Sequence, residues 1–206
     1  MKKLTIFPVL LITLLFTSCI EDIIEDVTEL EGPVLAKANV QGYNFVSKLG
    51  GGTFTVYQDN SYKLVLSFTD LDDVTDVLRD IHTLGIFIYG QNFNNLSSGI
   101  SYSELYQIET INEDNLGGFL GVYWTGNLIE DEINYIGASS GVEGSSGTFK
   151  ITALDTSNKI ISGTFNFTTI EEGSTREITI NSGEIINIEY DIEYSDIESI
   201  NIEIEG

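Results

Sequence analysis

The stretch at residues 185–194 carries an apolar side chain at every second position. The apolar positions are Ile186, Ile188, Tyr190, Ile192 and Tyr194, and between them stand Asn187, Glu189, Asp191 and Glu193. Successive side chains of a β-strand point to opposite faces, so this alternation predicts one face on a core and one face in water. That pattern is typical of an antiparallel sheet.

Further runs of the same character lie along most of the chain, separated by Gly, Asn, Asp and Ser. They cover residues 36–40, 43–48, 53–58, 62–69, 84–90, 118–125, 147–154, 159–170, 176–181 and 199–205. Turn-forming residues at 59–61 and 155–158 join neighbouring runs, and the second turn predicts a hairpin. We predict an all-β domain, an antiparallel β-sandwich or flattened barrel of roughly ten strands.

One segment, residues 69–83, departs from the period of two. Its apolar residues Val74, Val77, Leu78 and Ile81 have helical spacing. The residues ahead of them, Thr69, Asp70, Asp72 and Asp73, are of the types that cap a helix and match its dipole. The pattern predicts one short helix closing an end of the sheet, with His82 at the end of that helix.

The N-terminal residues predict export and lipidation. Lys2 and Lys3 precede an apolar run over residues 4–16, which is too short to span a bilayer. Ser18 and then Cys19, the only cysteine of the chain, follow this run. The arrangement resembles the cleavage site of a bacterial lipoprotein, so we predict that residues 1–18 are removed and that Cys19 carries the lipid. Lipidation leaves no thiol for a disulfide, a zinc site or a nucleophile.

Residues 19–33 form an acidic segment between the lipidated cysteine and the domain at residues 34–206. Its apolar residues allow a short helix, but short isolated helices are marginal in water, which favours a solvated tether. Glu21 and Asp22 resemble the surface-export signal of Bacteroidota lipoproteins. This resemblance implies a protein anchored in the outer membrane and facing the cell exterior.

The charge of the chain restricts its partners. It has 9 basic and 32 acidic residues and a formal net charge of −23, and removal of the signal discards two lysines and no acid. Such a field repels phosphate backbones and anionic head groups, so we expect no nucleic acid and no membrane contact beyond the anchor. Apolar residues make up 42% of the chain, which favours a folded domain over a disordered acidic tail.

The C-terminal half contains two short motifs, Ser-Gly-Thr-Phe-Asn-Phe at residues 162–167 and Ile-Thr-Ile-Asn-Ser-Gly at residues 178–183. They resemble the Ser-Gly-Thr-Phe-x-Phe and Ile-Thr-Asn-Gly motifs of a domain of unknown function that is common in secreted Bacteroidota lipoproteins; the first match is complete and the second has one extra residue. The resemblance extends over about residues 34–190. It implies no catalytic residue. We interpret Gly163 as a strand position where a facing ring or backbone needs room, and Phe165 and Phe167 as core.

Candidate chemistry is sparse. His82 is the only histidine, so a transition-metal site has too few ligands. No Gly-x-Ser-x-Gly nucleophile elbow accompanies His82, so a hydrolytic site based on it lacks its nucleophile. Calcium is the one metal to consider, with the cluster Asp70, Asp72, Asp73 and Asp76 as a weak candidate that lacks the spacing of a calcium loop. Helix capping explains this cluster better, and we expect no cofactor.

Aromatic residues are concentrated in residues 87–135. Tyr102, Tyr106 and Trp124 are candidates for stacking on a ligand, although Tyr and Trp are also frequent half-buried residues of β-domains. The favoured hypothesis is a non-enzymatic surface lipoprotein, a binding or accessory module for a glycan or protein partner. The alternatives are a carboxylate-based hydrolase such as a glycosidase, and a structural acidic coat protein.

Overall fold

The computed structural model describes residues 32–71, 81–103, 117–127, 132–139, 147–171 and 174–198. These residues form eleven strands and one 3-10 turn, η2 (Phe93–Asn95). The strands are β1 (Ala36–Val40), β2 (Tyr43–Ser47), β3 (Leu49–Val56), β4 (Tyr62–Leu71), β5 (Ile81–Gly90), β6 (Ser101–Ser103), β7 (Gly117–Asn127), β8 (Glu132–Ala138), β9 (Gly147–Asp155), β10 (Ile160–Glu171) and β11 (Glu177–Tyr194). Within these ranges no helix is long and apolar enough to cross a membrane.

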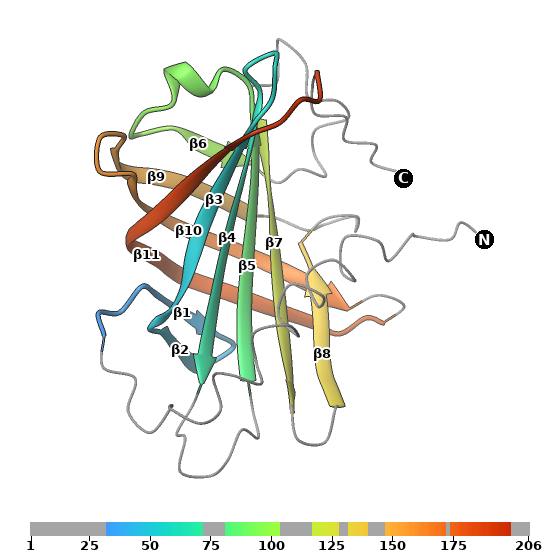
Figure 1. Ribbon diagram of the computed structural model, residues 1–206. Helices are drawn as coiled ribbons and strands as arrows, with labels where there is room; N and C mark the ends of the chain where they lie inside the picture. Colours follow the sequence, from blue (N-terminus) through green and yellow to red (C-terminus); the bar gives the residue numbers. More distant parts are fainter. Residues whose placement is uncertain are drawn as a thin grey trace, which may run out of the picture.

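The strands belong to one sheet that curves into a flattened barrel (Figure 1). Its order is β2-β1-β11-β3-β4-β5-β7-β8-β10-β9-β6, and an additional pairing between β10 and β11 closes the ring. Neighbouring strands are antiparallel except β3 and β11, which run parallel where Gly52 to Val56 pair with Tyr190 to Tyr194. The all-β prediction is confirmed, and of its two architectures the flattened barrel is the one observed.

Strand β11 closes the barrel because it pairs with three partners. It pairs with β1 and β10 along its first two thirds and with β3 along its last residues. Ser182 (φ 52°) and Asn187 (φ 51°) have left-handed backbone conformations, and the pairing with β10 shifts register next to each of them. Such bulges bend a strand and increase its twist, which lets one strand serve both walls of the barrel.

The bulge at Asn187 also changes which side chains face the core. Ile185 and Ile188 are both buried in the core, so Ile186 falls on the opposite face. The prediction that Ile186 shares the inner face with Ile188 is therefore wrong, because the period of two is broken at Asn187. At the other end of the run Tyr194 is 78% exposed.

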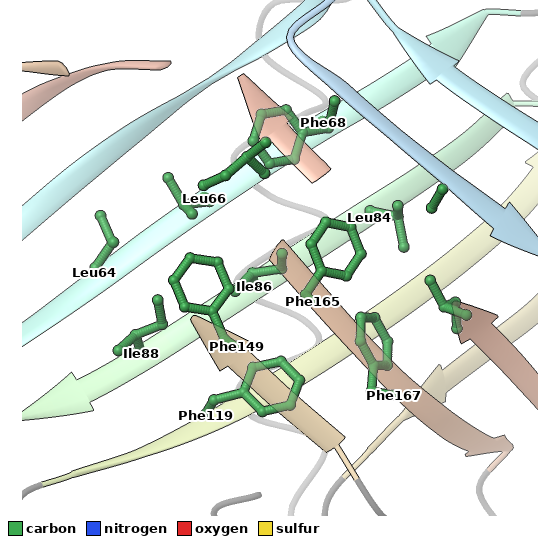
Figure 2. Close-up of a cluster of buried hydrophobic side chains, with 14 of the residues drawn as sticks. Leu64, Leu66, Phe68, Leu84, Ile86, Ile88, Phe119, Phe149, Phe165 and Phe167 are labelled. Atoms are coloured by element: carbon green, nitrogen blue, oxygen red, sulfur yellow. The ribbon is translucent and has the colours of Figure 1, made fainter. Parts of the chain in front are cut away.

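The interior of the barrel is filled by apolar side chains. Figure 2 shows leucines and isoleucines of β4 and β5 facing phenylalanines from β7, β9 and β10, with Phe149, Phe165 and Phe167 among them. These three rings are at most 2% exposed. The predicted core role of Phe165 and Phe167 is confirmed, and the packed interior leaves the outer faces and the ends of the barrel as the places for function.

The predicted hairpin at residues 155–158 is also confirmed, between β9 and β10. The Asp155 carboxylate accepts hydrogen bonds from the backbone N–H groups of Asn158 (2.9 Å) and Ser157 (3.0 Å). The Asn158 side chain donates a third hydrogen bond at 2.7 Å. These donors, those of Asn158 first, lower the pKa of Asp155 below its ordinary value because they favour the charged carboxylate.

Other predicted elements need correction. The runs at residues 176–181 and 185–194 are one strand, β11, and the strands β6 and β8 were not predicted. The predicted helix falls mostly on residues 72–80, outside the described residues, as does the run at 199–205. However, Thr69 and Asp70 lie in β4 and Ile81 and His82 lie in β5. Their predicted roles at the ends of a helix are wrong, because these residues continue the pairing of two strands.

Candidate functional site

The outward-facing side chains of β4, β5, β7 and β8 form an apolar surface on the outside of the barrel. The inward residues of these strands, such as Leu66 and Ile86, belong to the buried core, and the alternate positions point away from it. Strand pairing aligns the outward residues in rows, of which one is Val65, Phe87 and Leu120, the next Ser67, Gly85, Val122 and Ala138, and the third Thr69, Thr83, Trp124 and Ile136. We call Phe87, Tyr89, Leu120, Val122, Trp124 and Ile136 the outer apolar face.

The side chains of the outer apolar face are buried or half-buried. Val122 is only 6% exposed although it does not belong to the core cluster, and the other members are partly exposed. A Cβ atom on Gly85 would lie 3.4 Å from the ring of Phe87 and 3.7 Å from Cβ of Val122. Phe87 and Val122 therefore flank Gly85 on the outside of the barrel.

Trp124 carries the one anomaly of this surface. Its Nε1 atom is buried and has no hydrogen-bond partner. Buried polar groups in native proteins are nearly always hydrogen-bonded, and leaving such a donor without an acceptor costs about 1–3 kcal/mol. The donor is enclosed within the chain, so the Trp124 ring is half-buried and its N–H makes no hydrogen bond among the described residues.

Tyr89 of the outer apolar face and its neighbour Tyr57 both have raised pKa values. Burial, together with the neighbouring Tyr57, raises the pKa of the Tyr89 phenol to about 12. Burial also raises the pKa of Tyr57 above its ordinary value. Desolvation disfavours the phenolate, so a raised pKa is the expected behaviour of a partly buried phenol.

The outer apolar face differs from the rest of the surface in charge. On β4, β5 and β7, no described residue that points outward is acidic, and Lys63 is the only charged one. The acidic side chains of the opposite wall point outward from β11, where Glu177, Glu189, Asp191 and Glu193 are exposed. The two walls of one barrel therefore present opposite surfaces, one acidic and one apolar.

The three predicted stacking residues are not brought together. Trp124 lies on the outer apolar face, whereas Tyr102 lies inside the barrel and is 3% exposed. The Tyr102 hydroxyl is hydrogen-bonded to the hydroxyl of Tyr62, and its ring contacts Phe149. Tyr106 lies outside the described residues. Tyr102 thus offers no ring face to a ligand.

A second group of polar residues joins β2 to the barrel wall; it consists of Tyr43, Asp70, His82 and Tyr123. The Asp70 carboxylate accepts hydrogen bonds from the backbone N–H of Val46 (2.7 Å) and the hydroxyl of Tyr43 (2.9 Å). The Tyr43 ring stacks on His82 with centroids 4.0 Å apart, and His82 Nδ1 is hydrogen-bonded to the Tyr123 hydroxyl. These contacts fasten β2 to the barrel wall.

Asp70, a calcium candidate, and His82, the only histidine, are both held by contacts within the chain. Asp70 is 8% exposed, and one carboxylate oxygen already accepts two hydrogen bonds, which is the environment of a structural carboxylate. Asp72, Asp73 and Asp76, the other calcium candidates, lie outside the described residues. Among the residues described, no three His, Cys, Asp or Glu side chains gather in a way that would hold a metal ion.

The outer apolar face could have been predicted from the sequence of β5 and β7. Strands β5 and β7 contain apolar residues at consecutive positions, as in Ile86 to Tyr89 and Val122 to Trp124. Strands that are apolar on both faces are typical of sheets covered on both sides, in contrast to strands with one face in water. A prediction that considers only alternating positions does not detect this second apolar face.

The residues of the predicted anchor, Cys19, Glu21 and Asp22, lie outside the described residues. Their lipidation and export roles stay predictions, as does the resemblance to the domain of unknown function of secreted Bacteroidota lipoproteins. Comparison with known proteins found no family model, no curated protein and no solved structure that matches this chain.

Proposed function

We propose that this chain is a lipid-anchored protein of the cell surface that acts as a non-enzymatic assembly module and binds a protein partner through the outer apolar face. The observation that supports the proposal is the apolar surface around Trp124, where no outward-pointing described residue of β4, β5 or β7 is acidic. Anchoring at Cys19 and outward display through Glu21 and Asp22 come from the sequence pattern.

The composition of this face favours a protein partner. The centres of protein interfaces are depleted in charge and enriched in Trp, Tyr and Phe, and the outer apolar face has Trp124, Tyr89 and Phe87 with no acid among them. A glycan site would need several ring faces open for stacking, and Tyr102 is buried in the core. The hydrolase alternative requires a carboxylate pair in a cleft, and no observation on the described residues favours it.

Lipid anchoring predicts a simple phenotype for Cys19→Ala. The substitution removes the thiol that accepts the diacylglycerol, so the protein is expected to lose incorporation of radiolabelled palmitate and to leave the membrane fraction. Ser18, Glu21 and Asp22 stay in place, and an Asp22→Asn variant is the matched control for labelling. Persistent palmitate labelling of Cys19→Ala would overturn the anchor.

The binding surface predicts where a photo-crosslinker forms adducts. We expect a benzoylphenylalanine placed at Leu120, in the centre of the outer apolar face, to give a specific crosslinked species on intact cells. The same amino acid placed at Thr152, an exposed position on the outside of β9, is the matched control and is expected to give none. A denaturing gel measures the mass of each adduct, and mass spectrometry of the purified band identifies the crosslinked protein.

The outcomes separate the possibilities. An adduct at Leu120 that contains a defined protein supports an assembly module, whatever that protein is. Equal adducts at Leu120 and Thr152, or none at either position, would contradict the proposed binding surface. A saturable loss of the Leu120 adduct on adding neutral oligosaccharides would instead point to a glycan ligand.

A further inference from the structure

We infer that His82 controls the attachment of the β1–β2 hairpin to the barrel wall through its protonation, so that the hairpin is held firmly at mildly acidic pH and loosens as the pH rises. The residues that make this attachment, the β2 latch, are Tyr43 on β2, Asp70 on β4, His82 on β5 and Tyr123 on β7. The hairpin lies beside one end of β4 (Figure 1). The inference concerns this end of the barrel and does not rest on the outer apolar face.

Strand β2 depends on side-chain contacts because it is an edge strand. Among the described strands it pairs with β1 alone. One oxygen of the Asp70 carboxylate accepts hydrogen bonds from the backbone N–H of Val46 at 2.7 Å and from the hydroxyl of Tyr43 at 2.9 Å. At the end of β2 the Ser47 hydroxyl donates to the backbone oxygen of Thr69 at 2.6 Å. An edge strand with few partners is the place where a sheet opens locally.

His82 lies directly opposite Asp70 in the pairing of β4 with β5. Residues in this relation point to the same face of the sheet, with Cβ atoms about 4.5–5.5 Å apart. The imidazole also stacks on the Tyr43 ring, with centroids 4.0 Å apart and 17° between the planes. A change of charge on His82 therefore acts on the carboxylate and on the tyrosine that together hold β2.

The groups that face His82 favour its positively charged form. Asp70 places an opposite charge beside it from β4. The Tyr43 ring from β2 presents its face, and the face of an aromatic ring attracts a cation. The Tyr123 hydroxyl from β7 is hydrogen-bonded to Nδ1, and this hydrogen bond is stronger when the donor is an imidazolium.

The described cations near this end of the barrel do not reverse that balance. Tyr135 of β8 lies beside Tyr123, with ring centroids 6.0 Å apart, and the Arg176 guanidinium lies over the Tyr135 ring at 5.1 Å from its centroid. Lys48 stands at the junction of β2 and β3. The side chains of Arg176 and Lys48 are both exposed, so solvent screens their charge at His82.

The folded chain therefore holds the imidazole proton more tightly than the unfolded chain, in which histidine titrates at about pH 6.5. The stability that this proton adds is complete below that pH and is lost as the pH rises through the folded midpoint. Loss of the charge removes its attraction to Asp70 and to the Tyr43 ring. Alkaline conditions are therefore expected to loosen the hairpin.

The test is an NMR titration, from about pH 5 to about pH 9, of the mature chain carrying Cys19→Ala and no histidine tag. His82 is the only histidine, so a single imidazole signal follows its protonation. We expect a midpoint about one pH unit or more above that of the same chain unfolded in urea. A folded midpoint equal to or below the unfolded one would overturn the inference.

Asp70→Asn tests the source of the effect. The substitution removes the charge but keeps an oxygen that accepts hydrogen bonds, and it is expected to lower the folded midpoint by about one pH unit. Asp191→Asn, at an exposed position of β11, removes the same charge and is the matched control. It is expected to leave the midpoint unchanged. Equal shifts in the two variants would show that His82 responds only to net charge, and the β2 latch would be wrong.

Hydrogen exchange of the Val46 amide measures the attachment itself. Its protection factor is expected to fall about tenfold with rising pH for a one-unit difference between the folded and unfolded midpoints. His82→Gln keeps a side-chain donor but cannot gain a charge, so its Val46 protection factor is expected not to vary over this range. A Val46 protection factor that is constant in the unsubstituted chain, or that falls equally in His82→Gln, would contradict control by His82. Circular dichroism verifies the fold of each variant, and the midpoint of the unsubstituted chain decides the question if a variant does not fold.

Discussion

Replacing Gly163 with valine is expected to destabilise the barrel by about 3 kcal/mol or more, at the upper end of what overpacking costs. A Cβ atom at this position of β10 would lie 2.7 Å from Cζ of Phe149 and 2.8 Å from the backbone oxygen of Lys150. The ring is buried in the core and the carbonyl belongs to the paired strand β9, so neither can move aside without breaking other contacts. Urea unfolding followed by circular dichroism measures the loss.

Gly51→Val is the matched control. Gly51 lies in β3, and a Cβ atom there would meet nothing within 4 Å. Its backbone is outside the left-handed region, so valine fits the strand and is expected to leave stability unchanged or to raise it slightly. Equal losses at the two positions would show that the barrel tolerates no β-branched residue at a strand glycine, and the argument from Phe149 would fail.

Gly163 also shows what a short motif can predict. The sequence Ser-Gly-Thr-Phe-Asn-Phe indicated a glycine that leaves room for a ring and two phenylalanines in the core, and all three assignments are confirmed. They could be predicted because residues 163–167 keep the period of two, which puts Gly163, Phe165 and Phe167 on the same face of β10. The hairpin turn alone does not set these contacts, because the register of β9 against β10 shifts between Ser162 and Gly163. The ring that fills the space belongs to Phe149, which is paired with Phe165 and reaches diagonally from β9 to Gly163.

Strand boundaries away from that hairpin were harder to predict. The sequence Asn181-Ser182-Gly183 has the composition of a turn, yet it lies within β11 as a bulge. Local composition does not distinguish a bulge from a turn, because both use residues that adopt a left-handed backbone. Strand β6 has three residues, too few for any period to be seen.

The roles of Tyr102 and Asp70 depend on contacts between distant segments. Tyr102 is buried because β6 adds to the edge of β9 and brings its hydroxyl to Tyr62, 40 residues away. Asp70 is buried because β2 folds across the end of β4. The sequence predicted a stacking role for Tyr102 and a helix-capping role, or a weak calcium site, for Asp70. Only the closure of the barrel shows that both side chains are buried.

The buried tyrosines predict that the protein loses stability steeply between pH 10 and pH 12. Burial raises the pKa of Tyr102 to about 12, against an ordinary value of 10.0, and burial with the nearby Tyr102 hydroxyl raises that of Tyr62 further. In this range the unfolded chain releases phenolic protons that the folded chain retains. The folded state is therefore fully favoured below pH 10 and loses about 2–3 kcal/mol per shifted tyrosine as the pH approaches 12.

Tyr102→Phe separates this linkage from ordinary packing. At neutral pH the variant loses the hydrogen bond to Tyr62, which costs about 1 kcal/mol. Between pH 10 and pH 12 its free energy of unfolding is expected to fall less steeply than that of the unsubstituted chain, because one retained proton is missing. Tyr194→Phe, at an exposed ring, is the matched control. Urea unfolding at each pH, with phenolate absorbance recorded in parallel, gives both quantities. If the free energy of unfolding falls equally steeply with pH in Tyr102→Phe and in the unsubstituted chain, Tyr102 ionises at its ordinary pKa. Its burial in the core would then be wrong.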